Sequence, residues 1–320
     1  MTLLRPAARL TVAGRAFSAA EGAVRGLRLQ LGLGTHDAVT IALGPQSPLG
    51  DTEVDATLEV ALGYGDDPAV VFTGTVAGVE KVPGGLLLEG LAATWPLSRT
   101  RVAQSYVQQT VKQIVEDLLG QAEVDAGQID ASLKLFAFHV DERRTVWAHI
   151  QTLARLAACD VICAPDGTLD FHPPRSGPTA DHTLRHGADL VRWSLGPRQA
   201  PPAPAVVPYG AASEEGSEKW HVLLREPDGG SPDKPTLVPA ALRDRDGARA
   251  LETALGKAAE RSATGGALLV VGNAELRPGD VLELSDMPAG EPHLVRATAI
   301  THLLDGATGF RSALSVEGVA

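Results

Sequence analysis

Apolar and polar residues alternate along much of the first hundred positions. Leucines at every second position of 27–33 are separated by Arg28, Gln30 and Gly32, and residues 58–64 repeat this period. Successive side chains of a strand point to opposite faces, so each segment would carry one apolar face. Further strands are expected over residues 9–12, 39–43, 70–81 and 86–93. Short strands at this spacing predict a β-barrel or sandwich over residues 1–100.

The hydrophobic period becomes helical after residue 100. Thr110 and Gln113 fit a capping box, and apolar residues from Val111 to Leu119 fall on one helical face. A second helix is expected over residues 142–157. Next come two short apolar segments around Pro165-Asp166-Gly167, which predict a hairpin. Residues 101–190 are therefore expected to form a small α+β domain.

The last third of the chain returns to strands. A proline-rich stretch, 197–208, is typical of a linker, and a helix is expected over residues 245–261. The expected strands cover residues 268–271, 281–284, 294–301 and 311–316. Residues 191–320 thus form a second β domain with one helix. The predicted class is α+β, mainly β, with two antiparallel β-barrel domains and an inserted small α+β domain.

Composition narrows the possible functions. The 320 residues carry 28 Lys and Arg against 39 Asp and Glu, a net charge of −11. An acidic chain is not expected to bind nucleic acid, because that affinity comes from Lys and Arg displacing counterions. The longest apolar run, near 267–271, is far shorter than the roughly 20 residues of a membrane anchor. Two cysteines suit a reduced chain, cytoplasmic at synthesis.

Two motifs resemble ligand sites but lack essential parts. The loop Gly32-Leu33-Gly34-Thr35-His36-Asp37 has Asp37 where a dinucleotide-binding loop needs its third glycine, and a strand follows it. His182 and His186 are spaced like zinc ligands on a helix, but the general-base glutamate is missing. On a strand the two histidines would lie about 13 Å apart, too far to share a metal.

Three other groups are expected to be structural. Cys159 and Cys163 fit free buried cysteines, and the acids of Asp244-Arg245-Asp246-Gly247 fit the first turn of a helix. Asp66-Asp67 and Glu214-Glu215 lie in turn-rich segments. Aromatic residues make up only 4% of the chain, which disfavours a stacking cleft for sugars or bases. We therefore expect no enzyme activity and no catalytic, cofactor or metal site.

Several segments, in order, resemble the hub proteins of contractile tails, a group that includes phage late control gene D proteins and the N-terminal part of VgrG proteins. They are residues 72–76 with Glu80, 106–119, 141–156, 161–171, 277–281 and 294–302. Residues 106–119 resemble a family helix, residues 141–156 the helix of form D…W/F…L…LA, and residues 165–171 its pDG-x-L-x-F hairpin. Ala157-Ala158-Cys159 stands where the family usually has a glycine after that helix.

The resemblance implies two tube-like barrels with an inserted α+β domain. It also implies a homotrimeric ring that adapts a sixfold tail tube to a threefold spike, with tube protein, spike and other baseplate components as partners. The chain stops at Ala320, so the spike is expected to be a separate protein. The individual interface residues are not predicted. The particle would be a phage tail or a contractile injection system.

Two other functions stay open at this point. A tail-associated cell-wall hydrolase would need a cleft with a carboxylate or metal cluster. A tail adaptor or carbohydrate-binding β module would form a different oligomer or carry a platform of stacked aromatic rings. Four Trp and three Tyr residues make such a platform hard to build.

Overall fold

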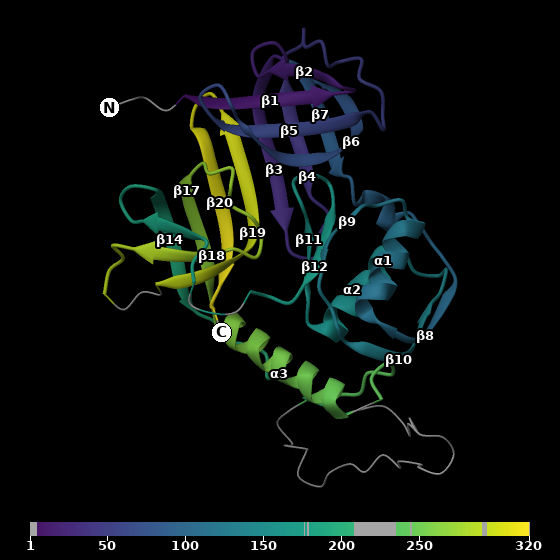
Figure 1. The fold of residues 1–320 in the computed structure, drawn as a ribbon. Coiled ribbons are helices and arrows are strands. Elements are labelled where there is room, and N and C mark those ends of the chain that lie inside the picture. The colour runs from purple at the N-terminus through teal and green to yellow at the C-terminus, as the bar shows by residue number, and fades with distance from the viewer. Residues whose placement is uncertain are drawn as a thin grey trace, which may run out of the picture.

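Strands dominate the N-terminal part of the chain (Figure 1). The computed structural model describes residues 5–175, 177, 179–207, 235–243, 245–289 and 293–319. The N-terminal strands are β1 (Pro6–Val12), β2 (Arg15–Ser18), β3 (Val24–Gly32), β4 (Ala38–Leu43), β5 (Thr57–Tyr64), β6 (Ala69–Val82) and β7 (Gly85–Ala92). The strands predicted for residues 1–100 are confirmed. In β3, Leu27, Leu29 and Leu31 are buried and Arg28 and Gln30 are exposed, as the alternation requires.

The C-terminal part also follows its predicted elements. Its strands are β13 (His182–Arg185), β14 (Leu190–Pro197), β15 (Ala205–Val206), β16 (Thr236–Leu237), β17 (Thr264–Val271), β18 (Val281–Ser285), β19 (Leu294–Asp305) and β20 (Gly309–Glu317). Helix α3 (Arg245–Ser262) covers the predicted helix. The mainly β, α+β class predicted from the sequence is confirmed.

One large sheet joins the two ends of the chain. Thirteen strands belong to it, and its main path runs β14-β17-β20-β19-β3-β4-β7-β6-β5-β1-β2. The N-terminal and C-terminal strands meet where β3 pairs antiparallel with β19, placing Leu29 opposite His302. The other end of β19 pairs with β18, which pairs in parallel with β13. The twelve residues of β19 can therefore serve two neighbours along one edge.

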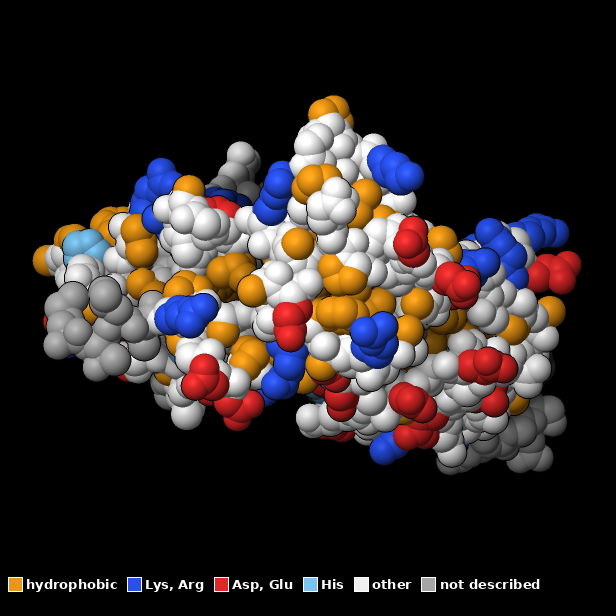
Figure 2. All heavy atoms as spheres, turned by 90° about the horizontal axis from the view of Figure 1, so that it is seen from above, with side chains coloured by type: hydrophobic (Ala, Val, Ile, Leu, Met, Phe, Trp, Pro, Cys, Tyr) orange, Lys and Arg blue, Asp and Glu red, His pale blue; other side chains and the backbone are white. Residues whose placement is uncertain are grey.

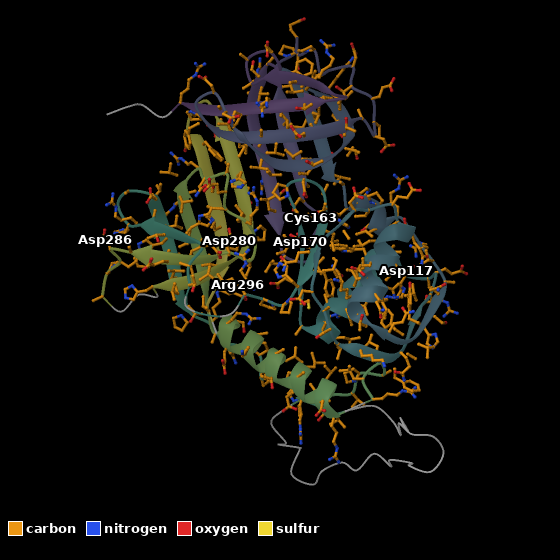
Figure 3. The ribbon with its side chains drawn as sticks, viewed as in Figure 1. Asp117, Cys163, Asp170, Asp280, Asp286 and Arg296 are labelled. Atoms are coloured by element: carbon orange, nitrogen blue, oxygen red, sulfur yellow. The ribbon has the colours of Figure 1, made fainter. Side chains whose placement is uncertain are left out.

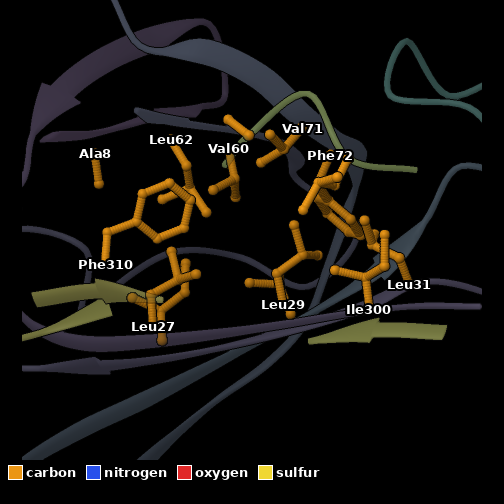
Figure 4. Packing of buried hydrophobic residues seen from close by; sticks show 14 of the residues in the cluster. Ala8, Leu27, Leu29, Leu31, Val60, Leu62, Val71, Phe72, Ile300 and Phe310 are labelled. Carbon is orange, nitrogen blue, oxygen red and sulfur yellow. The ribbon is translucent and has the colours of Figure 1, made fainter. Parts of the chain in front are cut away.

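The two strand sets share one hydrophobic core (Figure 4). Leu29 and Leu62 from the N-terminal strands lie in the same cluster as Ile300, Phe310 and other residues of β19 and β20. Each of those two leucines is fully buried, which stabilises a protein by roughly 1.5–3 kcal/mol per side chain. The shared hydrophobic core therefore holds the N-terminal and C-terminal strands together.

The inserted α+β unit has a core of its own. Its elements are η1 (Trp95–Ser98), β8 (Gln104–Thr110), α1 (Val111–Gln121), β9 (Ala126–Ile129), β10 (Lys134–Val140), α2 (Val146–Ala157), β11 (Asp160–Cys163) and β12 (Leu169–His172). The strands form two small sheets, β10-β8 and β11-β12-β9. Ile114 of α1, Ile150 of α2 and Phe171 of β12 are buried in its core. The predicted boundaries at 100 and 190 stay predictions.

Two predicted helix boundaries are wrong. Tyr106, which the resemblance placed with a helix, lies in β8, where it pairs with Phe138. Thr110 is the N-cap and its backbone is extended, so the residues before it cannot be helical. The capping box between Thr110 and Gln113 is confirmed. Helix α2 begins at Val146 rather than 142, because Thr145 caps it by accepting from the Ala148 amide.

Helix α3 links the α+β unit to the large sheet. Near its start, Ala248 and Leu251 are buried in the α+β core. Near its end, Arg261 Nε donates to Glu317 Oε1 of β20 at 3.2 Å. In Figure 1 the helix runs beneath both parts, from below α2 toward the C-terminus. It is therefore placed to hold the two parts in a fixed relation.

Candidate functional site

The motifs considered for metal binding do not assemble into a ligand set. His182 lies in β13, and His186 follows that strand in an isolated bridge to Leu190. His182 Nε2 lies 3.3 Å from Asp280 Oδ2, which gives this ring a structural partner. Within the described ranges, no three His, Cys, Asp or Glu side chains are grouped closely enough to hold a metal ion.

The two cysteines lie in settings that favour the protonated thiol. Burial raises the pKa of Cys159 to about 12, with nearby Asp160 and Asp130 adding to the rise. Burial raises the pKa of Cys163 to about 12 as well. A nucleophilic cysteine needs the thiolate near neutral pH, so both behave as small apolar residues.

The glycine-containing loop between β3 and β4 is a structural turn. The Asp37 side chain accepts from the Gly32 amide at 3.3 Å and is 5% exposed. Burial raises the pKa of Asp37 well above its usual value, against the lowering effect of that hydrogen bond. The acid therefore closes the loop, and the strand β4 that follows offers no helix N-terminus for a phosphate.

The other acidic groups noted in the sequence lie in turns, in the first turn of a helix or outside the described residues. Asp66 and Asp67 are exposed in the turn between β5 and β6. Asp246 lies in the first turn of α3, as expected. Glu214, Glu215 and Asp244 lie outside the described residues. That the chain has no catalytic, cofactor or metal site stays a prediction.

Three elements within the segments that carry the family resemblance, β11, the Pro165–Gly167 turn and the start of β19, lie at the junction between the α+β unit and the large sheet. Figure 3 shows this region, with Arg296 from β19 and Cys163 and Asp170 from the α+β unit near the middle of the molecule. We call this contact zone the junction. It comprises the β3–β4 loop, η1, β11, the Pro165–Gly167 turn and the start of β19. The junction is the candidate functional site.

One part of the junction is His36, whose ring packs against the rings of two tryptophans. The His36 ring lies 4.0 Å from the Trp147 ring of α2 and 5.3 Å, edge on, from the Trp95 ring of η1. Its nitrogens contact Thr94 Oγ1 at 2.9 Å and Ser98 Oγ at 2.7 Å. Burial lowers the pKa of His36 to about 4, so the ring is neutral near pH 7. A neutral ring with both nitrogens bonded is suited to fixing the β3–β4 loop.

Backbone contacts fix the same loop to the inserted unit. The Gly34 amide donates to the Val161 carbonyl of β11 at 2.8 Å. Gln151 Nε2 of α2 donates to the Gly34 carbonyl at 2.9 Å. Both backbone hydrogen-bonding groups of Gly34 are therefore satisfied by the α+β unit. These two bonds attach the β3–β4 loop of the large sheet to that unit.

The Pro165-Asp166-Gly167 turn rests on β6. Thr73 Oγ1 donates to the Pro165 carbonyl at 2.7 Å. Gly167 has φ +93°, and a Cβ there would lie 3.0 Å from Ala93 Cβ. Glycine is therefore required both by the backbone and by the close approach. The hairpin that the sequence predicts is confirmed, and the structure shows that its turn contacts Thr73 and Ala93.

A buried arginine completes the junction. Arg296 Nη2 of β19 donates to Asp160 Oδ2 of β11, and Arg296 Nη1 donates to Glu317 Oε1 at 2.8 Å. The Arg296 side chain is 2% exposed. Burial raises the pKa of Asp160, although the charge of Arg296 acts to lower it. The pair therefore depends on both partners remaining in place.

The turn at Pro278-Gly279-Asp280 lies beside this arginine. Asp280 Oδ2 accepts from the Arg277 amide at 2.7 Å, and Gly279 has φ +96°. A Cβ at Gly279 would lie 3.4 Å from Ile162 of β11. The predicted turn is thus confirmed as a tight structure that faces the α+β unit.

Sequence reasoning found the turns of the junction but missed its side-chain pairs. His36 was considered only as part of a glycine loop, and Arg296 was not singled out. His36 is 58 positions from Thr94, and Arg296 is 136 positions from Asp160. No local spacing signals such partners. The one available hint was Trp147, which belongs to the resembling helix.

Comparison with known proteins gives a fold. No family model and no curated protein matches the chain. Among solved structures, a tail protein from Neisseria meningitidis superposes with a TM-score of 0.72 at 15% identity, covering 98% of this chain and 96% of that one. The 43 kDa tail protein of a Shewanella oneidensis prophage gives 0.70 at 13% identity, covering 97% of each chain. The chain shares the fold of these tail proteins.

The same fold occurs in a secretion system. A protein of Escherichia coli, described as a component of the type VI secretion system, superposes with a TM-score of 0.63 at 13% identity. The match covers 93% of this chain and 74% of that protein. The α+β unit and both strand sets therefore belong to one arrangement found in both settings.

Proposed function

We propose that this chain is a structural hub protein of a contractile tail or injection particle. Three copies form a ring that adapts a sixfold tail tube to a threefold spike. The observation that carries the proposal is the shared fold with two tail proteins across 97–98% of the chain. The similarity of segments 72–76, 141–156, 161–171, 277–281 and 294–302 to hub proteins supports the same interpretation.

The junction supports a mechanical role. Its contacts link the α+β unit to the strands of the large sheet, as in the pairs Arg296–Asp160 and His36–Ser98. A rigid α+β unit on a continuous sheet is suited to transmitting force and holding position. The proposal includes the division into residues 1–100, 101–190 and 191–320, with two tube-like β parts around the inserted part.

The partners in this proposal are the tail tube protein, a separate spike protein and other baseplate components. Figure 2 shows hydrophobic side chains gathered between scattered acidic and basic ones on one face of the molecule. Surfaces of that kind are typical of protein–protein contacts. The chain would be made in the cytoplasm and then assembled into the particle. None of the described helices has the length and apolar character needed to cross a bilayer.

Solution mass tests the proposal. Light scattering after gel filtration should give a mass of about 100 kDa for three chains of 33.3 kDa, or that mass plus the bound spike when a spike protein is added. Negative-stain images of that species should show a threefold ring. A chain that stays at 33.3 kDa at high concentration, with the spike present, would contradict the proposal.

A further inference from the structure

A groove separates helices α2 and α3. Its volume is about 640 Å³, within the roughly 300–1,000 Å³ of pockets that enclose a ligand. Small apolar side chains from both helices line it, together with Leu33 and Leu255: Ala154, Ala157, Ala158, Ala254 and Ala258. Small residues leave room for a larger side chain from outside. The groove lies next to the junction, since Asp160 and Gly34 also line it.

The rims of the groove are positively charged. Arg155 on α2 and Lys257 on α3 are exposed and line it. Arg261, one turn beyond Lys257, is paired with Glu317. The acid that lines the groove, Asp160, is paired with the buried Arg296. In a chain of net charge −11, this groove therefore favours an apolar side chain flanked by carboxylates.

The loop between β4 and β5 presents that pattern. Val54 is 60% exposed, and the exposed acids Glu53 and Asp55 flank it, with Asp51 close by. The loop is held in shape, because the Asp55 amide donates to the Val76 carbonyl at 2.8 Å and Thr52 Oγ1 donates to the Leu49 carbonyl at 2.9 Å. A preformed loop loses little conformational freedom on docking.

The loop and the groove lie at different ends of the same strands. Strand β3 ends beside the groove, where Leu33 and Gly34 line it. Strand β4 runs antiparallel to β3, so the loop that follows β4 begins at the opposite end, as Figure 1 shows. Two complementary patches at different places on one chain meet through a head-to-tail contact between copies.

We propose that the Glu53-Val54-Asp55 loop of one copy docks in the α2–α3 groove of the next. Val54 enters between the alanines, and the flanking carboxylates pair with Arg155 and Lys257 across the rims. This contact rests on the ring proposed above and supplies an interface between its neighbouring copies.

Site-directed cross-linking tests the contact. Ala254 lines the groove, so a Val54→Cys, Ala254→Cys variant treated with a short bifunctional maleimide should give a covalent dimer. The variant also carries Cys159→Ser, because the native thiol lines the same groove. The same variant without the Ala254→Cys change should give no dimer. Val107→Cys, 61% exposed on β8, is the matched control and should stay monomeric on the gel.

Charge reversal is the second test of the proposed contact. Arg155→Glu with Lys257→Glu should weaken association on the order of a hundredfold, because like charges then face each other. Glu53→Lys with Asp55→Asn should do the same, and asparagine tolerates the positive φ of position 55. Equimolar mixing of the two variants should restore association between unlike copies. Light scattering over a dilution series measures each case.

The outcomes separate the two proposals. If the wild type is trimeric but its reversed variants associate normally and no cross-link forms, the loop contact is overturned and the ring stands. A wild type that is monomeric under all conditions overturns both. If added tube or spike protein alone protects the Ala254→Cys thiol from maleimide, the groove belongs to that partner and docking of a second copy is overturned.

Discussion

Arg296 on β19 pairs with Asp160 on β11, and the pair links the large sheet to the α+β unit. Arg296 is nearly fully buried and also contacts Glu317, while 12% of the Asp160 side chain is exposed. The pair therefore lies where the α+β unit packs against the large sheet. Losing one partner would leave a charge in a place that water reaches poorly.

Asp160→Asn should therefore destabilise the protein by roughly 3 kcal/mol, because Arg296 keeps its charge but loses a buried partner. Urea unfolding followed by circular dichroism measures the loss. The control is Glu116→Gln in the Lys112–Glu116 pair, whose side chains are 51% and 44% exposed. That change should cost less than about 0.5 kcal/mol. Equal losses for the two variants would contradict a special role for the buried pair.

Ala158→Gly should stabilise the protein by about 1 kcal/mol. Ala158 caps α2 with φ 50° and ψ 44°, a left-handed conformation that is unfavourable for a residue with a Cβ. It lies in the segment where the resembling family usually has glycine. Ala157→Gly, one position earlier and inside the helix, should destabilise by up to about 1 kcal/mol. The two midpoints in thermal unfolding should move in opposite directions, and a fall for both would refute the backbone argument.

Gly74→Ala should strongly destabilise the N-terminal strands, by about 3 kcal/mol or more. An added Cβ would overlap the Leu91 carbonyl of β7, with the carbonyl carbon 2.8 Å away, so β6 and β7 must separate. Gly120→Ala in α1 is the control, because no atom lies within 4 Å of its added Cβ. Helix propensity predicts that this control gains up to about 1 kcal/mol. Chemical denaturation distinguishes the two signs.

Acid should weaken the fold through two buried histidines. Burial lowers the pKa of His302 to about 3, with the charge of Arg277 adding to it, and burial lowers that of His36 to about 4. The unfolded chain takes up these protons near pH 6.5, whereas the native rings stay neutral. Their stabilisation is therefore present above pH 6.5 and is lost as the pH falls toward 4 and 3.

Variants of these histidines isolate the effect. Between pH 6 and pH 4, the free energy of unfolding of His302→Gln should fall less steeply than that of the wild type. The difference should be about 1.4 kcal/mol per pH unit, which corresponds to one proton. His36→Gln should show a similar difference down to about pH 4. Unchanged slopes in both variants would show that these rings are protonated in the folded protein.

The site illustrates why some residues were predictable and others were not. The turns at Pro165–Gly167 and Pro278–Asp280 were expected, because glycine and proline encode backbone shape locally. His302 was noted only as the end of a strand. The structure places it opposite Leu29, with Nδ1 2.8 Å from Ser312 Oγ and with no described partner for Nε2. Those neighbours come from other strands, so no local pattern could name them.

The sequence by itself determined the class of this protein and many of its strands and helices. The alternation at 27–31, the capping box at Thr110 and the helical stripe of α1 act over a few residues, and each was recovered. Tertiary structure alone decided that β3 pairs with β19, that His36 lies between Trp95 and Trp147, and that Arg296 reaches Asp160. Periodicity fixes which face of a segment is apolar. Which other face it meets depends on shape, burial and pairing across the whole chain, and these exist only once the chain has folded.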